Sequence, residues 1–141
     1  MSFVIDTNIL AYAYDSSEKI KRAKCLALVK NVYSGLKEAY VTNQILGELF
    51  YTFTKNFKKP LNKESARIII SSLIKSGNWL KINYDFNTVE KAIILSNEYG
   101  IHFWDSLIAA TMLENNVFAI YTENEKDFKK IPGIKVINPV K

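Results

Sequence analysis

Cysteine and histidine are almost absent from this chain, which has one of each among its 141 residues. Cys25 has no second cysteine to pair with, and no cluster of cysteines and histidines exists. A disulfide framework, a zinc finger and a redox Cys-x-x-Cys site are therefore excluded. We expect Cys25 to be a core residue.

Long apolar runs, linker-like stretches and internal repeats are missing as well. No segment reaches the roughly 20 apolar residues that a membrane-spanning helix needs, and the N-terminus has no basic flank followed by a long apolar run. A chain of 141 residues can bury most of its apolar surface in one core without disulfides. We therefore expect a single domain, residues 1–141, that is cytoplasmic and makes no membrane contact.

Positive charge exceeds negative charge by five, which alone favours a polyanionic partner only weakly. The distribution is more informative, because the basic residues gather in two segments while several acids stand beside apolar strands and helices. Either the acids line a pocket with basic surroundings, or the lysines simply cover solvated helix faces. The two segments contain Lys19, Lys21, Arg22 and Lys24, and Lys55, Lys58, Lys59, Lys63 and Arg67.

An apolar run from Phe3 to Ile5 leads directly into Asp6, Thr7 and Asn8. Such a run is typical of a strand buried on both faces, and ligands gather beyond the carboxyl ends of such strands in open α/β sheets. Thr7 and Asn8 can hydrogen-bond a neighbouring carboxylate and fix its orientation. The alternative is that Asp6 only caps a helix.

Strands and helices alternate along the rest of the chain. A helix is expected to begin near Asp15, with Glu18 at capping-box spacing, and to end near Gly35. Further helices are expected from residue 43 and over 62–76, 88–99 and 104–113, and further strands over 39–42, 80–84, 117–122 and 134–137. This alternation predicts an α/β fold with a mainly parallel central sheet and helices on both faces.

Further acids occupy positions where a site can form. Glu48 flanks the apolar stripe of its helix and faces either a pocket mouth or solvent. Asp105 stands in the first turn of a helix that is apolar nearly all round, so it needs a partner unless it acts as a cap or pairs with a lysine. Polar and acidic residues also follow the strand that ends at Thr122: Glu123, Asn124, Glu125 and Asp127.

Asp6, Glu48, Asp105 and one acid of the last group are compatible with one edge of the sheet. Several like charges at close range need a compensating cation, and ligands that are all oxygen select Mg²⁺ or Mn²⁺ over Zn²⁺. A bound metal ion makes its water easier to ionise and stabilises charge on a phosphoryl group. We therefore expect a Mg²⁺ or Mn²⁺ cofactor.

The order and spacing of four motifs resemble the PIN-domain family, a 5′-nuclease-like α/β/α sandwich. The motifs are Asp6-Thr7-Asn8 after an apolar strand, Glu48, Trp104-Asp105-Ser106-Leu107-Ile108-Ala109-Ala110, and Tyr121-Thr122 followed by Asp127-Phe128. In particular, the chain resembles the small single-domain VapC-type ribonuclease toxins of type II toxin–antitoxin pairs. The resemblance extends from residue 3 to about residue 137.

This resemblance implies a metal-dependent endoribonuclease that hydrolyses phosphodiester bonds in RNA. The implied metal-binding and catalytic acids are Asp6, Glu48 and Asp105, with Thr7, Asn8 and Thr122 orienting them. Asp127 is expected as the fourth acid, and Glu123 or Asn124, the latter as a neutral ligand or water-holding group, are the alternatives. Family members typically form homodimers and are inhibited by a small antitoxin protein whose C-terminal segment reaches into the acidic pocket.

Contacts with RNA are expected from the basic segments, which would hold flanking phosphates. Tyr12, Tyr14 and Trp104 are candidates for stacking on unpaired bases, although ordinary packing is favoured for Trp104.

Rival enzyme classes fit less well. A haloacid-dehalogenase phosphatase needs a second aspartate where this chain has Asn8, and a response-regulator receiver needs a strand-end lysine that has no clear place here. A hydrolase built on His102, Asp105 and Ser106 lacks the Gly-x-Ser-x-Gly turn. A catalytically silent module of the same fold that binds RNA or a protein is the remaining alternative.

Overall fold

A five-stranded sheet in which every neighbouring pair is parallel forms the centre of the structure, a computed structural model that describes residues 1–141. The strands are β1 (Phe3–Ile5), β2 (Ala39–Thr42), β3 (Trp79–Ile82), β4 (Ala119–Tyr121) and β5 (Lys135–Ile137). Their order across the sheet is β3-β2-β1-β4-β5. The predicted α/β fold is confirmed, and the sheet is wholly parallel.

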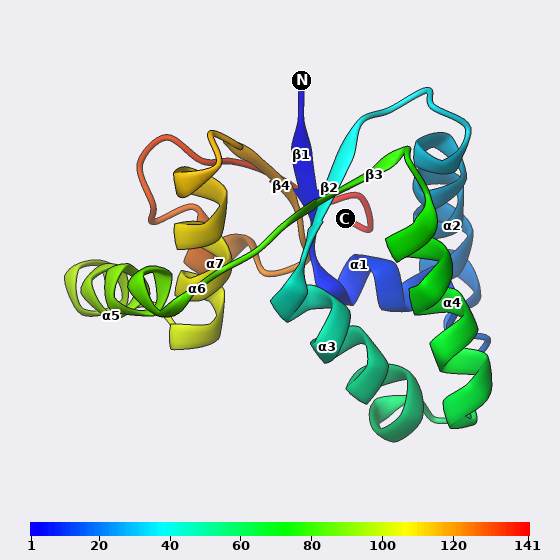
Figure 1. Cartoon of the computed structure of the whole chain (residues 1–141). Coiled ribbons are helices and arrows are strands. Elements are labelled where there is room, and N and C mark those ends of the chain that lie inside the picture. Colours follow the sequence, from blue (N-terminus) through cyan, green and yellow to red (C-terminus); the bar gives the residue numbers. More distant parts are fainter.

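Helices cover both faces of this sheet, as Figure 1 shows: α1 to α4 lie to one side and α5 to α7 to the other. The helices are α1 (Thr7–Tyr12), α2 (Lys19–Tyr33), α3 (Asn43–Tyr51), α4 (Lys63–Lys75), α5 (Phe86–Tyr99), α6 (Phe103–Glu114) and α7 (Glu125–Phe128), and a π-helical turn, η1 (Thr52–Asn56), continues α3. None of them combines the length and the apolar character that crossing a bilayer requires.

The direction in which strands are added to the sheet reverses beside β1. The chain first builds β1, β2 and β3 outward in one direction, and α5 and α6 then return it to β4 on the other side of β1. Ligands of open α/β sheets bind outside the carboxyl ends of the strands at such a reversal. Here the backbone N–H of Asp6 donates to the carbonyl oxygen of Tyr121 at 2.9 Å. The residues that follow β1 and β4 therefore face one crevice.

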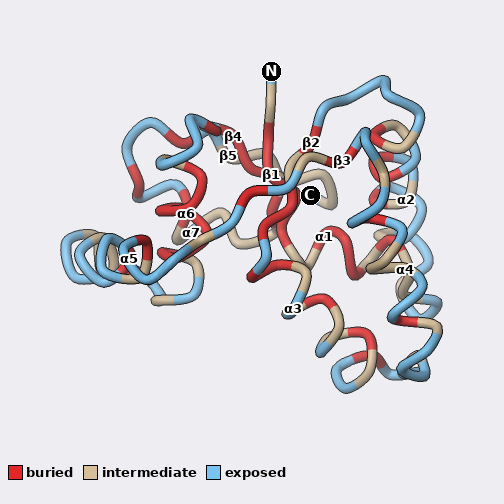
Figure 2. The backbone as a smooth tube through the Cα atoms, in the orientation of Figure 1, coloured by how far each residue is buried: buried red, intermediate tan, exposed pale blue.

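Burial explains why the central elements form. All of β1 is buried, and α6 is buried continuously from Ser106 to Met112, because the helix lies between the sheet and α5. Figure 2 shows buried residues concentrated in the strands and on the inner faces of the helices. Cys25 is fully buried in the same core, as predicted.

Three helix boundaries lie where the sequence predicts them, and a capping residue stands at each. Thr42 accepts a hydrogen bond from the N–H of Ile45 at 3.0 Å and starts α3. Asn62 does the same for Ser65 at 2.8 Å and starts α4. Gly100, with a φ of 63°, ends α5 in the left-handed conformation that glycine adopts without strain.

Two predictions about helix starts are wrong. Helix α2 begins at Lys19 instead of near Asp15, because the Asp15 carboxylate accepts from the N–H and hydroxyl of Ser17 and so closes a local turn. Helix α5 begins earlier than residue 88, because Asp85 and Thr88 form the capping box at its start.

Candidate active site

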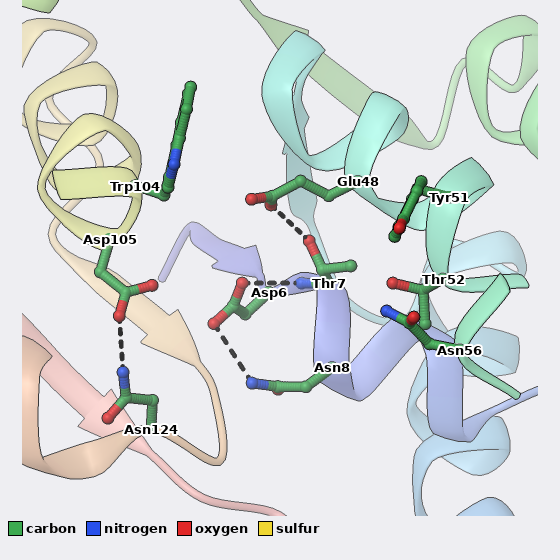
Figure 3. Close-up of a pocket in the computed structure, with 10 residues that line it drawn as sticks. All are labelled: Asp6, Thr7, Asn8, Glu48, Tyr51, Thr52, Asn56, Trp104, Asp105 and Asn124. Atoms are coloured by element: carbon green, nitrogen blue, oxygen red, sulfur yellow. Dashed lines mark hydrogen bonds between the residues drawn. The ribbon is translucent and has the colours of Figure 1, made fainter. Parts of the chain in front are cut away.

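A pocket of about 730 Å³ opens where β1 gives way to α1. Its lining brings three carboxylates together, and no lysine, arginine or histidine takes part. Figure 3 shows the lining side chains, with the carboxylates of Asp6, Glu48 and Asp105 directed toward the same space. The lining residues are Asp6, Thr7, Asn8, Glu48, Tyr51, Thr52, Asn56, Trp104, Asp105 and Asn124.

Asp6 both caps a helix and faces the pocket, so the two interpretations of this residue hold together. Its carboxylate accepts from the N–H of Thr7 at 2.7 Å, which starts α1 immediately after β1. It also accepts from the hydroxyl of Thr122 at 2.7 Å, and the amide of Asn8 lies 3.5 Å away. Only 5% of the residue is exposed, so its orientation is fixed by these neighbours.

Glu48 comes from α3 and is held through both carboxylate oxygens. The hydroxyl of Thr7 donates to one oxygen at 2.8 Å, and the side-chain amide of Gln44 donates to the other at 3.2 Å. Gln44 precedes Glu48 by four residues, so the two side chains lie on the same face of α3.

Gln44 was not predicted, although it ties the two walls of the pocket together. Its amide also donates to the backbone carbonyl of Trp104 at 2.9 Å, next to Asp105. This is the only hydrogen bond between α3 and α6, and Gln44 is 8% exposed. Its carbonyl oxygen is buried and accepts no hydrogen bond. The only signal for this role in the sequence is that Gln44 is a polar residue at a buried position of α3.

Asp105 lies in the first turn of α6 and faces the residues that follow β4. The amide of Asn124 donates to its carboxylate at 2.6 Å, and the same nitrogen lies 3.5 Å from the carboxylate of Asp127. Asn124 lines the pocket and Asp127 does not. Of the alternatives for the fourth position, Asn124 therefore lines the pocket and contacts Asp105 directly, and Asp127 lies outside the lining.

Burial and nearby negative charge make the carboxylates of Asp6 and Asp105 hard to ionise. Burial raises the pKa of Asp6 to about 7, and the charges of Asp105 and Glu48 add to this although hydrogen bonds from Thr122 and Thr7 oppose it. Burial also raises the pKa of Asp105 to about 6, with the charge of Asp127 as the next contribution. A nearby cation would relieve this repulsion.

Glu123 lies outside the pocket. Its carboxylate accepts from the hydroxyl of Tyr12 at 2.7 Å and from the ammonium of Lys21 at 2.9 Å. Its backbone N–H donates to the side-chain oxygen of Asn8 at 3.2 Å. Glu123 thus ties α1 and α2 to the turn after β4, and its charge is already compensated.

The pocket residues fit a hard divalent cation in their chemistry. Every charged donor in the lining is a carboxylate oxygen, which is the ligand type that Mg²⁺ and Mn²⁺ prefer. No three acids, histidines or cysteines are close enough together to form a compact ligand cage. An open set suits Mg²⁺, which keeps several of its own waters as ligands.

The predicted packing of the aromatic residues is partly wrong. Trp104 is not a core residue: it is 51% exposed, and its ring borders the pocket. Tyr14 is packed edge-on against Phe53, with ring centroids 5.6 Å apart, and does not line the pocket. Tyr12 is engaged with Glu123.

The hydrolase alternative has no structural basis. Ser106 is fully buried in α6, and its hydroxyl donates to the backbone carbonyl of His102 at 3.2 Å. His102 stands at the N-terminus of α6 and makes no side-chain cap. Neither residue lines the pocket.

Known proteins share this fold. The chain is similar to a toxin–antitoxin complex from Klebsiella pneumoniae, with 22% identity over 96% of each chain and a TM-score of 0.68. It is similar to VapBC2 from Rickettsia felis bound to a fragment of its promoter DNA, with 23% identity over 98% of each chain and a TM-score of 0.67. Mycobacterium tuberculosis VapC20, a toxin that cleaves the sarcin–ricin loop, is 14% identical over 88% of this chain and 91% of its own, with a TM-score of 0.62.

These identities are low enough that the solved structures establish the fold alone. No curated protein matches the sequence significantly. The family model described as PIN domain, however, matches residues 3–134, which is most of the chain and includes every lining residue of the pocket. The chain belongs to the PIN domain family.

Proposed function

We propose that this protein is a metal-dependent endoribonuclease that hydrolyses phosphodiester bonds in RNA, and that it is the toxin of a type II toxin–antitoxin pair. One observation carries the proposal: Asp6, Glu48 and Asp105 come from three different elements and face one open pocket without any basic side chain. Acids that merely stabilise a fold are usually paired or solvated, whereas these three are partly or wholly buried and share a cavity.

Asp6, Glu48 and Asp105 are the residues that would hold Mg²⁺ or Mn²⁺. When bound, such an ion makes a water easier to deprotonate and stabilises the charge that develops on the phosphate. Thr7 and Asn124 hold Glu48 and Asp105 by hydrogen bonds of 2.8 and 2.6 Å, which fixes the direction of the carboxylates.

The choice between the remaining candidates follows from the contacts at the pocket rim. Asn124 would be the neutral ligand or water-holding group, because it lines the pocket. Asp127 would be the fourth acid and act at longer range, because its charge raises the pKa of Asp105. Thr122 and Asn8 would orient Asp6.

RNA as the substrate is supported by the surroundings of the pocket and by one relative. Exposed Lys55, Lys58 and Lys59 lie on both sides of Asn56 in the sequence, and Asn56 lines the pocket, so these lysines can contact phosphates that flank the cleaved bond. VapC20, which shares the fold, cleaves the sarcin–ricin loop. The toxin–antitoxin complexes among the similar structures support a small antitoxin as partner. A homodimer in the cytoplasm is part of the same proposal.

Cleavage of end-labelled RNA by protein purified free of any partner tests this function. We expect products with Mn²⁺ or Mg²⁺, no products with EDTA, and a loss of at least about 100-fold in Asp105→Asn. Glu125→Gln is the matched control, because the carboxylate of Glu125 forms an ion pair with Lys129 and lies outside the pocket.

Equal cleavage by wild type and Asp105→Asn would identify a contaminating nuclease and contradict the proposal. RNA binding that is insensitive to EDTA and gives no products would instead identify a silent binding module.

A further inference from the structure

A second, smaller hollow adjoins the acidic pocket. Its volume is about 350 Å³, and it shares two lining residues with the pocket, Glu48 and Trp104. This volume is near the lower end of the roughly 300–1,000 Å³ of small-molecule sites. A ligand that reaches across Glu48 therefore extends from one space directly into the other. The remaining lining residues of the hollow are Asn43, Gln44, Gly47 and Tyr84.

The chemistry of this hollow differs from that of the pocket beside it. Two of its side chains are aromatic and two are neutral amides, and Glu48 at its border is the only charged residue. A phosphate would meet no positive charge there and would be repelled by Glu48. A flat, uncharged, aromatic group is favoured instead, because Trp104 is half-exposed and offers a face for stacking.

Side-chain amides of α3 hold both aromatic residues in place. The side-chain oxygen of Asn43 accepts from the backbone N–H of Tyr84 at 3.1 Å, and its amide donates to the carbonyl of Tyr84 at 3.4 Å. Gln44 donates to the carbonyl of Trp104 at 2.9 Å. The walls are thus tied to one helix before any ligand arrives, which reduces the entropy cost of binding.

Gly47 keeps the hollow open. A Cβ atom added to this residue would meet no atom within 4 Å, so a larger side chain can enter the space without displacing the backbone. A substitution at Gly47 can therefore fill the hollow while leaving the hydrogen bonds of Asn43, Gln44 and Glu48 in place.

We propose that this hollow is a nucleobase subsite, which takes the base of an unpaired nucleotide next to the phosphate at Asp6, Glu48 and Asp105. The proposal rests on the proposed function for its substrate, RNA. It implies that the enzyme cuts within unpaired segments, because a base must leave its helix to enter the hollow. It also implies that the base in the hollow determines which bond is cut.

Tryptophan fluorescence tests the subsite without any cleavage. The chain has two tryptophans, of which Trp79 is fully buried, so a stacking ligand quenches Trp104. The probes are adenosine, guanosine, cytidine and uridine, with ribose 5-phosphate as the control without a base, all in EDTA. We expect at least one nucleoside to quench, ribose 5-phosphate to have no effect, and Trp104→Phe to lose the quenching.

Filling the hollow should weaken the binding of that nucleoside. Stacking on one aromatic residue accounts for about a 5- to 100-fold change in affinity, and we expect Gly47→Leu to lose this amount. Gly77→Leu is the matched control, because Gly77 is equally open and lies before β3, whereas the hollow lies beyond the carboxyl ends of β2 and β3. It should bind like wild type.

Cleavage-site mapping separates failure of the subsite from failure of the proposed function. If metal-dependent cleavage is present, Gly47→Leu should change the distribution of cut positions. Unchanged positions together with no quenching by any nucleoside would overturn the subsite and leave the nuclease intact. Quenching by a nucleoside in a protein that cuts no RNA would support the subsite and count against the nuclease. A change in the Trp104 emission caused by N-acetylphenylalanine amide and by no nucleoside would overturn the proposal in favour of an aromatic side chain of a protein partner.

Discussion

Two groups of acids lie at the same edge of the sheet, and they differ in whether a cation already compensates them. Asp6, Glu48 and Asp105 face the pocket, and none of them forms an ion pair. Glu123 and Glu125, which follow β4, each accept from a lysine at 2.9 Å. Asp6 and Asp105 follow a strand or begin a helix just as Glu123 and Glu125 do, so their places in the sequence do not distinguish the two groups.

The pKa values of Asp6 and Asp105 are raised, whereas those of Glu123 and Glu125 are lowered. Burial raises the pKa of Asp6 to about 7 and that of Asp105 to about 6. Hydrogen bonds from a lysine and an asparagine lower the pKa of Glu125 to about 2. Burial raises the pKa of Glu123, but hydrogen bonds from a tyrosine and a lysine outweigh it and leave the pKa lowered. A cation-binding site is therefore indicated by acids that lack an internal partner, not by acids alone.

Metal binding gives the largest expected contrast between the groups. At a Mn²⁺ concentration 100 times its dissociation constant, wild type should gain about 3 kcal/mol of stability, or roughly 10 °C in melting temperature. Glu48→Gln and Asp105→Asn should lose most of this gain, and Glu125→Gln should keep it. Differential scanning calorimetry in EDTA and in Mn²⁺ measures the effect. Equal gains in stability for wild type and all three variants would contradict the proposed difference in cation binding between the two groups of acids.

Gln44→Leu tests whether the pocket acids depend on the link between α3 and α6. The substitution leaves the carbonyl of Trp104 without its donor and frees one oxygen of Glu48. We expect a loss of about 2 kcal/mol in the free energy of unfolding, as for other buried groups left unpaired, and about tenfold in kcat/KM. Urea denaturation and single-turnover cleavage measure the two losses. Normal cleavage in a destabilised protein would make Gln44 purely structural.

Asp105→Asn should stabilise the protein in EDTA, because an asparagine needs no counter-ion. The raised pKa means that ionisation of Asp105 opposes folding: the cost is absent below about pH 4, develops as the pH rises to about 6, and is complete above that. A shift from 3.8 to about 6 corresponds to roughly 3 kcal/mol, and we expect about 1 kcal/mol because the carboxyl is partly exposed. Thermal melts at pH 4 and pH 8 measure it. A gain of the same size at both pH values would contradict this cause.

The lysines can be compared in the same way as the acids, because some form ion pairs and others form none. Lys55, Lys58 and Lys59 are exposed and form no ion pair. Replacing all three with glutamine should reduce the slope of log affinity against log salt by about 2 and weaken RNA binding most at low salt. Fluorescence anisotropy across a salt series checks this, and an unchanged slope would exclude these lysines from the RNA path.

Local signals were enough to predict much of this fold. The caps at Thr42 and Asn62 and the stop at Gly100 depend on residues within four positions, and the buried strands are continuous apolar runs. Helix α1 was foreseen only through the alternative that Asp6 caps a helix, and no bounds were predicted for it. It has six residues, too few to form alone, and depends on burial of Ile9 and Leu10 in the core.

The acids that face the pocket were predictable from the sequence, but the contacts that orient them were not. Asp6, Glu48 and Asp105 are brought to one pocket as the motifs suggested. The choice between Asn124 and Asp127 depends on a turn into a four-residue helix, which has no distinct sequence signal. Gln44 acts on a carbonyl 60 residues later in the chain, and such a contact exists only in the folded state.

The pairing of β1 with β4 determines when the site can exist during synthesis. Thr122, which holds Asp6, is 116 residues further along the chain, and Asn124 must also be present to hold Asp105. Chains emerge from the ribosome N-terminus first, and α1 to α4 can pack before β4 is made. Until about residue 125 has emerged, β1 has only β2 beside it and Asp6 lacks the hydrogen bond from Thr122, so an unfinished chain on its ribosome cannot assemble the three-acid pocket.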